Sequence, residues 1–202
     1  MSFGRSMFAA SYDFLMKGME RQYFRKIREG LLRQAKGRTL EIGAGTGANL
    51  EWYGSGHEKE RVFLEPSRPM LTRGIRKGMK KTGTPVQGDA ARLPFPPRFF
   101  DTVVVTLVLC SVERWTDAIQ EIRRVLKTDG KLIFLEHVRS SRPAIRRLQE
   151  WLTPLWKHVA AGCHLDRPTD VMVEQNFIAE EKTVLLIRGT PLVSAVYRMK
   201  TE

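Results

Sequence analysis

Short runs of branched apolar residues alternate with helical or loop segments, and this alternation constrains the fold more than any other feature. Five such runs occupy residues 39–43, 61–65, 84–88, 101–109 and 131–138. The segments between them, GANLEWY, RPMLTRGIRKGMKK and WTDAIQEIRRVLK, are predicted to be helices, and Gly130 is expected to end the last of them. Strands that alternate with helices are typical of a parallel sheet covered on both faces.

The two ends of the chain add further elements. Residues 12–35 place apolar side chains three and four apart, which predicts an amphipathic helical region. A second amphipathic segment at 142–159 is expected to break at Pro154, before a loop and a short helix. Strand-like runs at 177–189 and 191–200 are joined by so short a turn that they must pair antiparallel. We therefore expect one α/β domain over 1–202: a doubly wound, Rossmann-like, seven-stranded, mostly parallel sheet with an antiparallel C-terminal hairpin and a helical N-terminal cap at 1–36.

Charge and composition restrict the partners. Lys and Arg total 34 against 22 Asp and Glu, giving a net charge of +12 and a pI near 10.1. This charge favours contact with anions (nucleic acid, an anionic membrane or acidic small molecules) and fits a solvated basic surface equally well. The sequence has no apolar run long enough to span a bilayer and no secretory signal, so a cytoplasmic protein is expected. Cys110 and Cys163 lack metal-ligand spacing, which indicates reduced thiols and no metal site.

A glycine-rich turn, GAGTGA, follows the first predicted strand and admits more than one ligand. Gly43, Gly45 and Ala48 match the dinucleotide pattern, with Glu65 about 20 residues on, where a ribose-binding acid belongs. A turn that only packs a helix is the simpler alternative. Glu41, inside the strand, instead suits a ligand with an ammonium group near the amides of residues 44–47, and would repel a pyrophosphate.

Two more features accompany Glu41. Asp89 lies in a loop after the third predicted strand, where its carboxylate can accept from an adenine amine while Ala90 packs on the ring. The antiparallel hairpin is foreign to the common dinucleotide domain. Together these motifs resemble the class I S-adenosylmethionine-dependent methyltransferases. The resemblance implies S-adenosylmethionine as cofactor, with contacts from Tyr12, Glu41, Gly43, Ala44, Gly45, Gly47, Glu65, Pro66, Asp89, Ala90, Thr106 and Leu107.

Other motifs resemble a narrower group, the methyltransferase-like thiol S-methyltransferases. They are TLVLCSV at 106–112, EHV at 136–138, and PLWKH at 154–158 followed by Gly-Cys and an Arg at 167. The resemblance implies a small-molecule acceptor, with a thiol favoured, and a substrate cap at 142–175. The members of that group carry a hydrophobic amino-terminal anchor that this sequence does not show, so membrane contact is expected to be peripheral.

Methyl transfer to a thiol needs alignment more than base catalysis, because a thiol has a pKa of about 8.5 and supplies some thiolate near neutrality. A positive side chain would raise that fraction, and His137, His158 and Lys157 are the candidates. Tyr12 is expected to close over the cofactor with its hydroxyl near the sulfonium. Cys110 and Cys163 are interpreted as pocket-lining or core thiols, since the methyl group passes directly to the acceptor.

Two other functions compete with thiol methylation. The first is N-methylation of a phospholipid or small amine, which a basic cap with apolar side chains would serve at an anionic bilayer: Arg142, Arg146, Arg147, Trp151, Leu152, Leu155 and Trp156. The second is a protein that binds the cofactor without catalysis, or one that binds nucleic acid through the basic residues of 66–88, a stretch without Asp or Glu. No interleaved aromatics accompany that stretch, so nucleic acid is disfavoured and a solvated helix face is expected.

Overall fold

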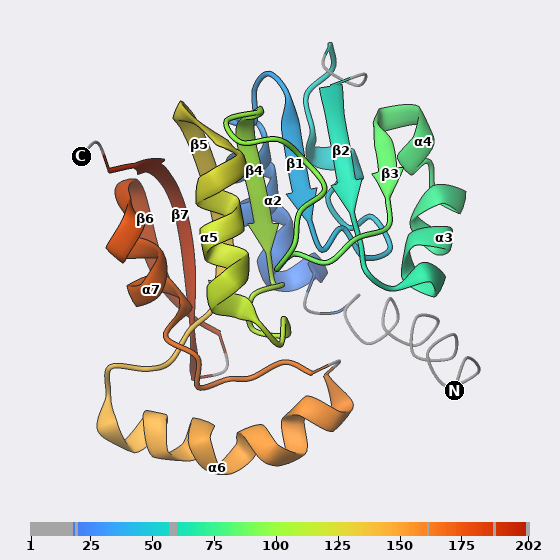
Figure 1. Cartoon of the computed structure of the whole chain (residues 1–202). Helices are drawn as coiled ribbons and strands as arrows, with labels where there is room; N and C mark the ends of the chain where they lie inside the picture. The colour runs from blue at the N-terminus through green and yellow to red at the C-terminus, as the bar shows by residue number, and fades with distance from the viewer. Residues whose placement is uncertain (1–17, 19, 57–59, 161, 188, 201–202) are drawn as a thin grey trace.

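A computed structural model of the chain describes residues 18, 20–56, 60–160, 162–187 and 189–200. In this part of the chain seven strands form one sheet in the order β3-β2-β1-β4-β5-β7-β6 (Figure 1). The strands are β1 (Thr39–Ile42), β2 (Arg61–Leu64), β3 (Thr84–Val86), β4 (Phe100–Thr106), β5 (Leu126–His137), β6 (Phe177–Ile187) and β7 (Thr190–Met199). The first five are parallel to one another, and β7 pairs antiparallel with both β5 and β6. The predicted sheet and its C-terminal hairpin are confirmed.

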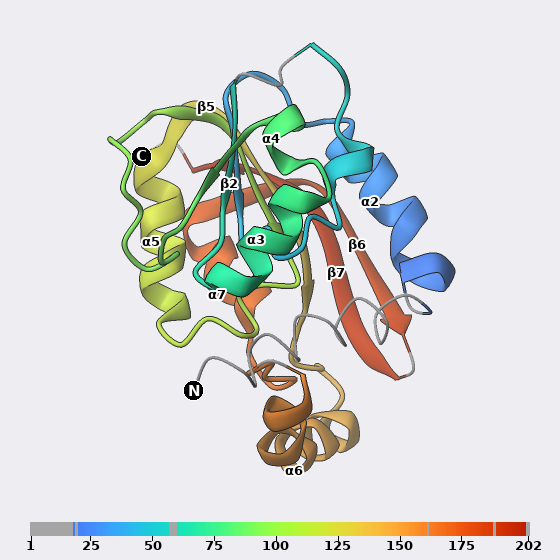
Figure 2. The same ribbon diagram turned by 90° about the vertical axis from the view of Figure 1, so that its right-hand side faces the viewer.

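Helices cover both faces of the sheet because alternate residues of the central strands are apolar on each side. One face packs against α2 (Arg25–Leu32), where Leu32 joins Val104 and Ile133 in a buried cluster. The same face of β2 packs against α3 (Arg68–Arg76) and α4 (Met79–Thr82) through Phe63. The other face packs against α5 (Trp115–Val125) and α7 (Thr169–Asn176). Figure 2 shows α2 and α5 on opposite sides of the sheet.

Three details of the helices predicted between residues 47 and 130 were wrong. Helix α5 ends at Val125, and Gly130 lies inside β5, where a Cβ would come within 3.0 Å of the Asp101 carbonyl oxygen. The predicted helix at 68–81 is two helices, separated near Gly78, whose φ is +112°. The GANLEWY segment forms a turn and a short 3-10 helix, η2 (Leu50–Trp52), because its glycine turn extends further than expected.

The predicted N-terminal and C-terminal helical regions are described in part. A π-helical turn, η1 (Glu20–Phe24), leads into α2, which packs on the sheet itself; the rest of the predicted cap, with Tyr12, lies outside the described residues. Helix α6 (Pro143–Val159) continues through Pro154, although a break was predicted there. It lies beyond the carboxyl ends of the parallel strands (Figure 1). No helix within the described residues is both long enough and apolar enough to cross a bilayer.

The close contact between Gly83 and β2 predicts a stability change. A Cβ on Gly83 would meet the Arg61 carbonyl oxygen at 2.7 Å and Phe63 Cε2 at 2.6 Å. Because the first obstacle is backbone, Gly83→Ala should lower the free energy of unfolding by about 1–3 kcal/mol. Gly54→Ala is the matched control, since a Cβ there meets nothing within 4 Å. Urea unfolding of both variants tests this, and equal stability of the two would contradict it.

Candidate functional site

A cavity of about 650 Å³ opens at the carboxyl ends of β1, β2 and β4. Its wall includes ten of the residues expected at the cofactor: Glu41, Gly43, Ala44, Gly45, Glu65, Pro66, Asp89, Ala90, Thr106 and Leu107. Gly47 belongs to the same turn but does not line the cavity, and Tyr12 lies outside the described residues. In open parallel sheets, ligands bind at this edge.

Backbone amides of the glycine turn donate hydrogen bonds to carbonyl groups of the protein. Gly43, Gly45 and Gly47 have φ values of +65°, +56° and +85°, a region that side chains rarely adopt. The Ala44 amide donates to the Leu64 carbonyl at 3.0 Å, and the Gly47 amide donates to the Ala44 carbonyl at 2.9 Å. These two amides are therefore satisfied within the protein. Backbone donors already used inside the protein do not form an anion nest, which argues against a pyrophosphate.

Glu65 follows β2 directly and anchors the turn. Its Oε2 accepts the Gly45 amide at 3.0 Å and its Oε1 accepts the Ser67 amide at 2.8 Å. The side chain is buried, and burial raises the pKa of its carboxyl above the ordinary value. Each carboxylate oxygen retains capacity for a second donor, so Glu65 can accept two ligand hydroxyls at the cavity wall.

Glu41 lies in a buried polar network. Its Oε1 accepts from Asn49 Nδ2 at 2.9 Å, and its Oε2 accepts from the Tyr53 hydroxyl at 2.7 Å. Burial raises the pKa of this carboxyl to about 7. Asn49 Nδ2 also donates to Thr106 Oγ1 at 2.9 Å, which ties the end of β1 to the end of β4.

Arg28 of α2 completes this network and was missed by the sequence analysis. Its Nη1 donates to Asn49 Oδ1 at 2.5 Å and to Thr106 Oγ1 at 3.0 Å, and its Nε lies 2.7 Å from Glu20 Oε1. An arginine in an amphipathic helix ordinarily faces water, so the sequence contains no signal for this burial. The cavity wall therefore carries a guanidinium and a carboxyl group, Arg28 and Glu41, and can hold a zwitterion.

Asp89 and Ala90 line the cavity from the loop after β3. Asp89 Oδ1 accepts the Ala91 amide at 2.9 Å, and Oδ2 accepts from Arg114 at 2.8 Å. The Ala91 amide, followed by Arg114, holds the pKa of Asp89 below its usual value. Ala90 is buried and offers an apolar surface. The carboxylate stays ionised and able to accept, as recognition of an exocyclic amine requires.

The loop after β4 is held by the strand beside it. Leu107 has a φ of +57°, a strained value for a side-chain-bearing residue, and lines the cavity. Glu136 of β5 accepts the amides of Val108 and Leu109. Arg167 donates to the Leu109 carbonyl at 2.7 Å. The EHV motif and the arginine at 167 thus shape the cavity floor.

The structure corrects the proposed role of His137. Burial lowers the pKa of its imidazole to about 4, so the ring is neutral at pH 7 and cannot supply the positive field that was expected. Its Nδ1 is buried with no hydrogen-bond partner in the described part of the chain, and the ring packs edge-on against Phe24, 6.5 Å between centroids. Lys157 is exposed on α6; His158 is on the same helix, and its side chain lies outside the description.

Cys110 follows β4, Cys163 follows α6, and both are free thiols. Cys110 is buried in the core, and its Sγ lies within hydrogen-bonding reach of Cys163. Neither thiol is part of the cavity wall. The described residues contain no group of His, Cys, Asp or Glu that could hold a metal.

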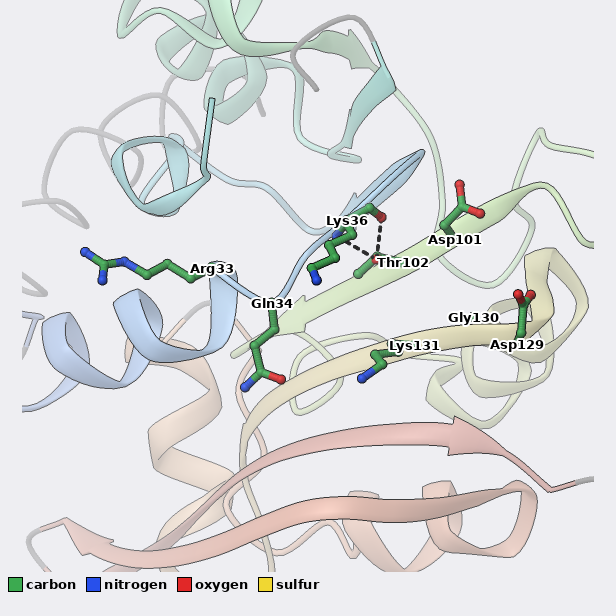
Figure 3. A pocket seen from close by; sticks show the side chains of 8 residues that line it. All are labelled: Arg33, Gln34, Lys36, Asp101, Thr102, Asp129, Gly130 and Lys131. Atoms are coloured by element: carbon green, nitrogen blue, oxygen red, sulfur yellow. Dashed lines mark hydrogen bonds between the residues drawn. The ribbon is translucent and has the colours of Figure 1, made fainter. Parts of the chain in front are cut away.

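A second hollow, of about 390 Å³, lies at the amino ends of β4 and β5 (Figure 3). Its Thr102 hydroxyl donates to the Lys36 carbonyl at 2.8 Å, and Asp101 accepts the Arg38 amide at 2.8 Å. These polar groups brace the strand ends, and the opposite edge remains the candidate site.

Comparisons with known proteins agree with this geometry. A family described as "Methyltransferase domain" matches residues 40–134. Thiol S-methyltransferase TMT1B of Rattus norvegicus is 33% identical over 169 residues, 82% of this chain and 69% of the relative. The ubiquinone/menaquinone biosynthesis C-methyltransferase UbiE of Ectopseudomonas mendocina is 32% identical, covering 70% of this chain and 59% of the relative.

A solved structure from Thermotoga maritima, described as an S-adenosylmethionine-dependent methyltransferase, has the same fold. Its TM-score is 0.70 at 20% identity, with 100% of each chain covered. The fold, the family match and the rat relative together support one assignment. The chain belongs to the class I S-adenosylmethionine-dependent methyltransferases, and S-adenosylmethionine is its cofactor.

Proposed function

We propose that different residues of the cavity wall bind different parts of the cofactor. Arg28 and Glu41 offer opposite charges to the amino-acid part, and Glu65 offers two acceptors to the ribose hydroxyls. Asp89 and Ala90 offer an acceptor and an apolar surface to the adenine. When bound, S-adenosylmethionine supplies a methyl group on an electrophilic sulfonium. The donor set on the wall fits each part of this molecule.

We infer that the acceptor is a small hydrophobic thiol, methylated directly by in-line transfer. The 33% identity to a thiol S-methyltransferase over 82% of the chain carries this inference. The wall also suits such an acceptor: its loop after β4 presents the apolar side chains of Leu107, Val108 and Val112. A thiol ionises near neutrality without a strong base, and the neutral, buried His137 is too weak a base to deprotonate an amine.

The residues of the acceptor side would act by positioning. The apolar loop excludes water and orients the thiol, while Glu136 and Arg167 hold that loop in place. His137 does not line the cavity and its Nδ1 is buried, so we assign it no contact with the acceptor. Tyr12 and His158 remain candidates for contacts with the cofactor and acceptor. The identity to UbiE makes a quinol-like acceptor the main competitor, ahead of an amine or phospholipid.

The division of the cofactor site predicts selective losses of affinity. Glu65→Gln should weaken S-adenosylhomocysteine and 5′-methylthioadenosine alike, by about 2 kcal/mol, because both ligands carry the ribose. Arg28→Lys should weaken S-adenosylhomocysteine more than 5′-methylthioadenosine, which lacks the amino-acid carboxylate. The exposed Arg33 is the matched control, as Arg33→Lys. Titration calorimetry tests the pattern; equal losses for both ligands in Arg28→Lys would contradict the subsite.

The raised pKa of Glu41 predicts pH-dependent binding. The free carboxyl has a pKa of about 7, so it is partly protonated below pH 7. A ligand ammonium favours the ionised form and lowers that pKa, so binding releases a proton and affinity rises from pH 5.5 toward pH 7.5. Glu41→Gln should flatten this rise. Calorimetry in buffers of different ionisation enthalpy measures the released proton, and proton uptake on binding would contradict the prediction.

The acceptor class is tested by a screen of alkyl thiols, amines, phospholipids and quinols with labelled cofactor. We expect a hydrophobic thiol to be methylated fastest, with a rate that rises with pH until the acceptor's own pKa, about 8.5, is passed. Cys110→Ser with Cys163→Ser should retain activity, since no methylated enzyme is required. Faster turnover of a quinol or amine would overturn the thiol assignment and leave the cofactor assignment standing.

A further inference from the structure

Helix α6 carries a stripe of exposed apolar side chains. Intervals of four, three and four residues place them on one side of the helix: Ala144, Leu148, Trp151 and Leu155. The exposed fractions are 53% for Leu148, 75% for Trp151 and 71% for Leu155. Trp156 beside them is 45% exposed. Large apolar side chains that are exposed together mark an interaction surface.

The two buried side chains described in α6 are polar, and Ile145 and Leu152 beside them are half-buried. Gln149 is 3% exposed, its Oε1 accepts the Ser140 amide at 2.8 Å, and its Nε2 donates to the Val138 carbonyl at 3.1 Å. Thr153, one turn further along, is 5% exposed. A surface helix normally buries its apolar side on its own core. Here the largest apolar side chains point outward, so they are available to an apolar phase outside the chain.

Positive charge borders the apolar stripe. Residues 139–160 contain five Lys or Arg and a single acid, Glu150, which lies 3.9 Å from Arg146. Arg142 and Arg147 are exposed near the amino end of α6, and Lys157 is exposed near its carboxyl end. An apolar stripe with tryptophan and flanking cations suits a surface that is anionic outside and apolar beneath. Nucleic acid would leave the apolar stripe uncovered.

The position of α6 relates this surface to the cofactor site. Both views show α6 beyond the carboxyl ends of the parallel strands (Figures 1 and 2). The cofactor cavity opens at the same edge of the sheet. A planar surface against α6 would therefore lie on the cavity side of the molecule.

We propose that α6 is an interfacial docking helix that lies flat on an anionic lipid bilayer. Leu148, Trp151 and Leu155 insert below the headgroups, and Arg142 and Arg147 contact the lipid phosphates. Docking then turns the cavity edge toward the bilayer, where hydrophobic acceptors partition. The docking does not depend on the acceptor class, and it is tested without turnover.

Co-sedimentation with vesicles tests the proposal directly. We expect binding to phosphatidylcholine mixed with phosphatidylglycerol, weaker binding at high salt, and little binding to phosphatidylcholine alone. Trp151→Ser with Leu155→Ser should weaken binding by roughly tenfold or more. Arg142→Gln with Arg147→Gln should weaken it roughly 30-fold, at about 1 kcal/mol per charge. All variants should retain S-adenosylhomocysteine binding, which confirms that they are folded.

A matched pair of charges near the β3 edge of the sheet controls for net charge (Figure 1). Arg76 and Lys80 are exposed on α3 and α4, so Arg76→Gln with Lys80→Gln removes the same charge and should leave vesicle binding nearly unchanged. An equal loss in this control, or unchanged binding in the Trp151 and Leu155 variant, overturns the proposal. Sedimentation velocity without lipid gives another test. A dimer that dissociates in the Trp151 and Leu155 variant would also overturn the proposal, because the apolar stripe would then join two copies of the chain.

A second measurement reports insertion itself. Lipids brominated on the acyl chains quench indoles that enter the bilayer, so anionic vesicles of such lipids should quench the protein's fluorescence. Trp151→Phe should remove the larger part of this quenching while vesicle binding persists. Binding without quenching would mean that the charges alone adsorb the protein, and the inserted geometry would be wrong.

Discussion

The buried contact between Arg28, Asn49 and Thr106 joins the parts of the molecule that make its site. Asn49 bonds to Glu41 of β1 and to Thr106 of β4, and Arg28 brings α2 to the same point. A buried charge without partners is costly, so these groups hold one another in a single arrangement. The position of α2 on the sheet and the shape of the cavity wall depend on this network.

Carboxylates at other strand ends perform a related task. Glu65 after β2 accepts the Gly45 and Ser67 amides, and Glu136 at the end of β5 accepts amides of the loop after β4. Parallel strands end in loops whose amides have no strand partner, and an acid at the strand end satisfies them. Both acids therefore shape the loops at this edge of the sheet, and Glu65 also lines the cavity, whereas Glu136 is fully buried. Their burial raises the pKa of Glu41, Glu65 and Glu136 alike.

Much of the fold follows from local pattern. The runs of branched apolar residues form strands, as predicted. The short turn before Pro191 joins β6 and β7, which pair antiparallel. Boundaries were less predictable where long-range packing decides them. Glycine is typical of the end of a helix, yet Gly130 lies inside β5. The Asp101 carbonyl oxygen beside it leaves no room for a side chain. Helix α6 continues through Pro154, where the local propensity of proline alone would have ended it.

The sequence by itself determined the family, the cofactor and ten residues of the cavity wall, because residues of the glycine turn and of the strand ends lie next to one another in the chain or at fixed strand positions. Only the tertiary structure decided which charges meet. Arg28 reaches Thr106 from 78 positions away, and His137, which packs against Phe24 of η1, loses its charge through burial. Likewise, the sequence showed that α6 is amphipathic, whereas the fold alone decided that Gln149 faces inward and Trp151 outward. Burial is a property of the whole packed chain, so no local pattern contains it.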